Sequence, residues 1–135
     1  MDIKWGDELK TGIAVIDEQH QFIVEALSGV ETTKLDKEKL FQLLLDLQAY
    51  LSVHFDVEED YMKETNYSGY ESHKAIHDKV LEDYQNILAK DEKNLTTNEV
   101  ALKLADYMQN WFVGHYSNED VKMADHLKQN LWKIL

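Results

Sequence analysis

Apolar residues recur at helical spacing in four segments of the chain, and each of these apolar stripes carries at least one histidine. The stripes run from Ile13 to Val30, from Leu40 to Met62, from Tyr70 to Ile87 and from Ala101 to His115. Side chains three or four residues apart share one face of a helix, so each stripe marks a face that packs into a core. The histidines are therefore expected inside the protein.

The four stripes predict an all-α fold. Proline is absent and glycines number only five, which suits long helices joined by short connections. We expect a single domain over residues 1–135, folded as an up-down four-helix bundle. Residues 1–12 predict a non-helical N-terminal arm whose Trp5 packs on the bundle. Residues 121–135 predict a short helical extension, either continuous with the fourth helix or separate from it.

Two pairs of side chains have the spacing of chelating ligands. His54 and Glu58 are four residues apart, as are His73 and His77, so on helices each pair points in one direction. Turn-forming residues lie between the pairs, at 66–69. This stretch therefore predicts a helical hairpin with a candidate metal-binding pair on each arm.

Side chains that meet across antiparallel helices must lie equally far from the connecting turn. The two pairs have a midpoint near residue 66, inside the proposed turn. The second pair and the region of His115 and Asp120 have one near residue 96, in a polar segment. His20 and the first pair have a midpoint near residue 38, a few residues past the expected loop between the first two helices. Helix tilt can absorb this offset. Five of the six histidines thus share one layer, and burying them without compensation would be costly. A metal site is the expected compensation.

Other polar residues are expected at the surface. These are His126, which falls outside the layer, and most of the 26 acidic residues, including Glu59 and Asp60. One carboxylate position stays open. Asp120 lies five residues after His115, about 140° round a regular helix, and would need a local widening such as a π-bulge. Glu119, four residues after His115, satisfies regular geometry.

Charge and composition limit the partners. A formal charge of −12 argues against nucleic acid and anionic membranes, and the absence of cysteine leaves histidine and carboxylate as metal ligands. Five imidazoles with carboxylates suit iron better than magnesium or calcium. With no apolar signal region and no run of about eighteen apolar residues, a cytoplasmic protein is expected.

These residues resemble the hemerythrin family, in particular its single-domain bacterial members. The matching elements span nearly the whole chain: Trp5, Thr11-Gly12-Ile13, Ile16-Asp17, Gln19-His20, His54-Phe55, Glu58-Glu59, Met62, His73, His77, Trp111, His115 and Asp120. The resemblance implies two iron ions in a non-haem centre with an oxo or hydroxo bridge. It assigns His73, His77 and His115 to one iron and His20 and His54 to the other. Glu58 and Asp120 would bridge the irons, which favours Asp120 over Glu119.

The resemblance also implies a dioxygen pocket. It places Ile23, Phe55 and Trp111 around that pocket. Two positions depart from the family pattern: Ser68 stands where proline is usual, and Tyr116 where an aliphatic residue is common. We include Tyr116 among the pocket residues, because a phenol beside the site can hydrogen-bond a ligand or alter autoxidation.

This ligand set leads to a functional prediction. With a solvent-derived bridge, the iron with three histidines is saturated and the other keeps one vacancy, where dioxygen can bind. Ferritin-like oxidases use carboxylate-rich sites instead. We therefore predict reversible dioxygen binding for oxygen transport, storage or delivery, and no enzymatic role beyond weak oxidase or peroxidase-type activity. The alternatives are a di-iron sensor of oxygen, nitric oxide or redox state with an unidentified protein partner, and a peroxidase-like scavenging enzyme.

Overall fold

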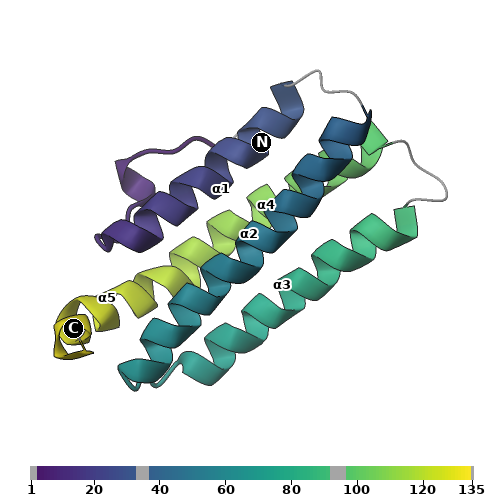
Figure 1. The fold of residues 1–135 in the computed structure, drawn as a ribbon. Helices are drawn as coiled ribbons and strands as arrows, with labels where there is room; N and C mark the ends of the chain where they lie inside the picture. Colours follow the sequence, from purple (N-terminus) through teal and green to yellow (C-terminus); the bar gives the residue numbers. More distant parts are fainter. Residues whose placement is uncertain (1–2, 33–36, 92–96, 135) are drawn as a thin grey trace.

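A computed structural model describes residues 3–32, 37–91 and 97–134. Four long helices run alternately up and down: α1 (Ala14–Thr32), α2 (Lys37–Glu64), α3 (Tyr70–Asp91) and α4 (Thr97–His115) (Figure 1). The shorter elements are η1 (Asp7–Leu9), the π-helical segment η2 (Tyr116–Asp120), α5 (Val121–Asn130) and η3 (Leu131–Ile134). The predicted all-α four-helix bundle is confirmed. Within the described ranges, no helix has the length and apolar character needed to cross a membrane.

The C-terminal extension continues directly from α4. His115 has φ −64° and ψ −46°, and Val121 has φ −62° and ψ −43°, so the backbone stays helical across the junction. The N–H of Val121 donates to the carbonyl oxygen of Tyr116, five residues back, which is the π-helical pattern. Of the two arrangements left open by the sequence, the structure has the continuous one.

The N-terminal arm lies beside α1 (Figure 1). It contains a short 3-10 turn, closed by a bond from the Leu9 N–H to the Gly6 carbonyl oxygen, where a wholly non-helical arm was expected. Ile3 and Leu9 are buried in a small apolar cluster, against which Trp5 packs as predicted.

The entry into α1 depends on one carboxylate and one glycine. Asp17 accepts hydrogen bonds from the Thr11 N–H at 2.7 Å and from the Gly12 N–H at 3.1 Å. Gly12 has φ +90°, and a Cβ at this position would lie 2.8 Å from Cε of Lys128. The backbone conformation therefore favours glycine here, whereas the end of the flexible Lys128 side chain could move aside.

The turn between α2 and α3 has Schellman geometry. Asn66 has φ +58°, the Tyr67 N–H donates to the Met62 carbonyl oxygen at 2.8 Å, and the Asn66 N–H donates to that of Lys63 at 3.2 Å. This turn brings the start of α3 back along the end of α2, as the sequence predicts.

A polar layer divides the core into two apolar parts. Towards one end, Ile23, Leu51, Val80 and Met108 belong to a large buried cluster. Towards the other end, Ile16, Met62 and Met123 belong to a smaller one. The residues between the two clusters on each helix are the histidines and carboxylates of the predicted layer: His20, His54, Glu58, His73, His77, His115 and Asp120.

Candidate metal centre

The structure brings all seven predicted side chains together inside the bundle. Each is no more than 5% exposed. Ligand atoms of one group, the three-histidine group, lie within 4.8 Å of one another; it comprises His73, His77 and His115 with Glu58 and Asp120. His20, His54 and Glu58 form a second group by the same measure, the two-histidine group. The arrangement can hold metal ions, and the ligand role of each residue stays a prediction.

Glu58 lies between the two groups. Its Oε2 is 3.2 Å from Nε2 of both His20 and His54, and its Oε1 is 3.2 Å from Nε2 of His77. One carboxylate oxygen thus faces each group.

Asp120 repeats this arrangement from the other side of the layer. Its Oδ1 is 2.9 Å from Nε2 of His115 and 3.2 Å from that of His73, while its Oδ2 is 3.4 Å from that of His20. The π-helical segment makes this possible, because one additional residue per turn returns a side chain five positions on to the same face. Asp120 is 1% exposed, and Glu119, the geometric rival, is only half-buried and outside both groups.

Two histidines donate a hydrogen bond from their outer nitrogen, Nδ1, to a neighbouring side chain. The Nδ1–H of His54 donates to Oε1 of Gln19 at 2.7 Å, and that of His77 donates to Oε2 of Glu59 at 2.9 Å. These bonds leave Nε2 of each ring turned to the centre of the layer. The expectation that Glu59 lies on a solvated face was wrong: its side chain is 12% exposed, because the packing of α3 on α2 encloses it.

Aromatic rings enclose the layer on the side of the larger apolar cluster. Phe55 stacks on His77 with ring centres 4.0 Å apart, and Trp111 stacks on His115 at 4.4 Å. Phe112 meets His20 edge-on at 5.1 Å. These contacts fix the planes of three imidazole rings and keep that side of the layer apolar.

A narrow cavity adjoins the layer between these rings. It is too narrow to hold a water molecule and is lined by His20, Ile23, Leu51, His54, Phe55, Trp111, Phe112, His115 and Asp120. Ile23, Phe55 and Trp111 therefore lie where a pocket was expected. Sequence reasoning missed Leu51 and Phe112 as lining residues. Helical spacing could have found Phe112, which lies four residues after Met108 and three before His115.

Tyr116 lies outside that lining, in contrast to the expectation. Its hydroxyl donates to the carbonyl oxygen of Lys10 in the N-terminal arm at 3.0 Å. The side chain therefore ties η2 to the N-terminal arm, and within η2 it is Asp120, not Tyr116, that lies in the layer.

His126 was expected at the surface and is instead half-buried. Its Nε2 lies 3.1 Å from the carbonyl oxygen and 3.0 Å from Oγ1 of Thr65, and its ring centre lies 4.9 Å from that of Tyr67. It fastens α5 to the end of α2 and lies outside both candidate metal groups.

The electrostatics of the layer couple its acids and bases. Burial alone would lower the pKa of His73, but the nearby carboxylates of Asp120 and Glu58 outweigh burial and raise this pKa to about 9. Burial and the charge of Glu58 act to raise the pKa of Asp120, yet the imidazoles of His115 and His73 beside it hold this pKa at about 2. Burial would likewise raise the pKa of Glu58, whereas His54 and His20 keep it well below its ordinary value.

Several buried polar atoms of the layer would be better satisfied by coordinating a metal ion than by hydrogen bonds to one another. Among the described residues, the buried side-chain atoms without a hydrogen-bond partner are Nδ1 of His20, His73 and His115, Nε2 of His73, Oε1 of Glu58 and Oδ1 of Asp120. Unsatisfied buried polar atoms are costly. The inward-facing ones, Nε2 of His73 and the two carboxylate oxygens, are atoms that ion coordination would satisfy.

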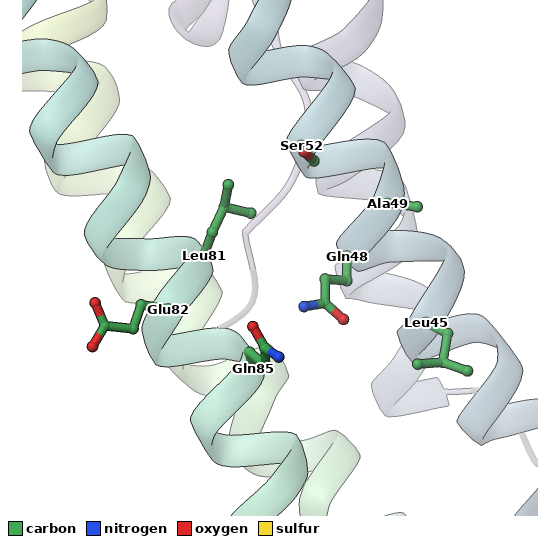
Figure 2. Close-up of a pocket in the computed structure, with 7 residues that line it drawn as sticks. All are labelled: Leu45, Gln48, Ala49, Ser52, Leu81, Glu82 and Gln85. Carbon is green, nitrogen blue, oxygen red and sulfur yellow. The ribbon is translucent and has the colours of Figure 1, made fainter.

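Another hollow of the surface lies apart from this layer. A groove between α2 and α3 is lined by Leu45, Gln48, Ala49, Ser52, Leu81, Glu82 and Gln85 (Figure 2). Figure 2 shows Gln48 and Gln85 pointing toward one another across it. Its lining includes none of the seven clustered residues, so we assign it no role.

The bundle and its buried histidine–carboxylate layer define a class of helical protein built to hold metal ions. Within that class, the chain belongs to the hemerythrin family: the family model "Hemerythrin HHE cation binding domain" matches residues 11–127. The family binds iron and dioxygen and is in general oxygen-binding rather than enzymatic. The predicted family resemblance is confirmed.

Individual proteins agree with this assignment. The bacteriohemerythrin of Pseudomonas aeruginosa is 26% identical over 133 residues, which covers 97% of this chain and 85% of the relative. That of Aquifex aeolicus is 30% identical over 120 residues, with 87% and 92% covered. A crystal structure of a hemerythrin point mutant superposes with a TM-score of 0.80 at 23% identity, covering 94% of this chain and 98% of that one. At this identity the structural likeness bears on the fold alone.

Proposed function

We propose that this chain binds two iron ions and binds dioxygen reversibly at them. The observation that carries the proposal is the placement of Glu58 and Asp120, each with one oxygen toward the three-histidine group and one toward the two-histidine group. A carboxylate so placed is suited to bridging two ions. His73, His77 and His115 would hold one ion, and His20 and His54 the other.

The apolar cavity supports reversible binding over turnover. Iron held in the ferrous state by these histidines and carboxylates would supply the electrons that dioxygen takes up. The role of the chain is to keep water and proton donors away, and Phe55, Trp111 and Phe112 supply apolar walls beside the imidazoles. Because the hydroxyl of Tyr116 is turned to Lys10, it does not bring a proton donor into this cavity.

The test is a cycle of oxygen exposure and removal. The purified protein is loaded with iron, reduced under anaerobic conditions, exposed to oxygen and then flushed with inert gas, while visible absorption is recorded. We expect two irons per chain and a spectrum that appears with oxygen and disappears when oxygen is withdrawn, over repeated cycles. Conversion to a ferric form at the first exposure would favour a scavenging enzyme or a sensor, and failure to bind iron would refute all three functions.

A further inference from the structure

The outer nitrogens, Nδ1, of the five clustered histidines differ in their hydrogen-bond partners. His54 donates to a neutral amide, Gln19, and His77 donates to a carboxylate, Glu59. Nδ1 of the other three is buried without a hydrogen-bond partner. The only negatively charged partner among the described contacts of these outer nitrogens therefore belongs to the three-histidine group.

The charge of such a partner changes the strength of the ligand. A histidine that donates its Nδ1 proton presents Nε2 to an ion, and the acceptor fixes both tautomer and ring orientation. A carboxylate acceptor also stabilises the positive charge that the ring gains from the ion, and hydrogen bonds to a charged group are about twice as strong as neutral ones. An amide acceptor orients the ring without this charge compensation.

On the basis of the two-ion site proposed above, we propose that Glu59 and Gln19 are positioning residues that make the two ion positions unequal. Glu59 strengthens the position of the three-histidine group, which fills first. Gln19 orients His54 and leaves the two-histidine position the weaker of the two.

The surroundings of Glu59 hold it in place for this role. Its Oε2 accepts from His77, while its Oε1 lies 3.9 Å from Nζ of Lys74. Lys74 in turn bonds Asp78 at 2.8 Å. On the opposite side of the contact, Phe55 stacks on the His77 ring with planes 9° apart. The ring is thus held by a charged hydrogen bond and by a stacked aromatic side chain.

Titration of the metal-free full-length protein with cobalt(II), followed by visible absorption under anaerobic conditions, tests the inference. The wild type should bind two ions in two steps of different affinity. Glu59→Gln keeps a hydrogen-bond acceptor but removes the charge, and should weaken the first step about tenfold, the lower end of what loss of an outer-shell partner costs. Asp60→Asn is the matched control, because it removes the same charge from an exposed neighbouring position on α2, and should leave both steps unchanged.

A second variant tests the inference at the two-histidine position. Gln19→Glu gives His54 a charged acceptor and should strengthen the second step, so that the two affinities approach each other. Equal titration curves for Glu59→Gln and Asp60→Asn, or an unchanged second step in Gln19→Glu, would overturn the inference. The Gln19→Glu titration decides by itself if circular dichroism shows that Glu59→Gln is unfolded. A wild type that binds no ions would overturn the proposed function instead.

Discussion

Glu58 and Asp120 share His20: Oε2 of Glu58 lies 3.2 Å and Oδ2 of Asp120 lies 3.4 Å from the same Nε2 atom. Their other oxygens face His77 and His115 in the three-histidine group. The two carboxylates thus link the halves of the layer. In the proposed two-ion site, both ions would depend on this same pair of side chains.

Replacement of Asp120 should therefore affect both ion positions. Asp120→Asn keeps the shape of the side chain but removes its charge, and we expect both cobalt(II) affinities to fall by at least about tenfold. Glu119→Gln is the control, since Glu119 is half-buried and outside both groups, and it should bind as the wild type does. Equal losses in the two variants would contradict the placement of Asp120 in the site.

Substitutions of histidines inside and outside the layer should likewise have different effects. His77→Ala removes a chelating side chain and should lower iron content, measured on the purified protein by elemental analysis. His126→Ala should retain full iron content but lower the free energy of unfolding by about 1 kcal/mol, because it loses a hydrogen bond to Thr65. Urea unfolding measures the second effect. Iron loss from His126→Ala would show that the layer had been assigned wrongly.

The metal-free protein should lose stability as pH rises from about 6.5 to about 9. The pKa of His73 is raised from 6.5 to about 9, so in this range the folded state binds more protons than the unfolded state. The stabilisation is fully present below pH 6.5 and is lost on passing pH 9, an effect on the order of 3 kcal/mol for this group.

Iron affinity should show the opposite dependence on pH. Imidazoles must be deprotonated to bind an ion, so binding releases protons and strengthens as pH rises over the same range. Urea unfolding measures the slope of stability against pH for the metal-free protein, and cobalt(II) titration at the same pH values measures the slope of metal affinity against pH. Slopes of the same sign would contradict protonation of His73 in the metal-free layer.

Tyr116→Phe should change stability but not oxygen chemistry. The hydroxyl donates to the Lys10 carbonyl oxygen, so its loss should lower the free energy of unfolding by about 0.5–1 kcal/mol. Iron content and the rate of autoxidation should equal those of the wild type at matched pH and temperature. A change of several-fold in that rate would show that the phenol reaches the cavity after all.

Helical spacing in the sequence was sufficient to predict much of this protein. The period of the apolar residues predicts the four helices, and the four-residue spacing of His54 with Glu58 and of His73 with His77 predicts which side chains point the same way. The equal depth of the histidines follows from antiparallel packing and short turns. These features were accessible because each depends on a regular helix and its nearest connection.

The tertiary structure decided the surroundings of the residues at the edges of each apolar stripe. Helical spacing left Asp120 and Glu119 open and the family resemblance favoured Asp120; the π-helical segment turns Asp120 inward and leaves Glu119 outside. Glu59 is enclosed because α3 packs beside it, and Tyr116 is drawn to Lys10 by an arm distant in sequence. A helical period specifies the direction of a side chain about its own axis. Only the neighbouring elements specify whether that direction leads to solvent, to another chain segment or into the layer of histidines and carboxylates.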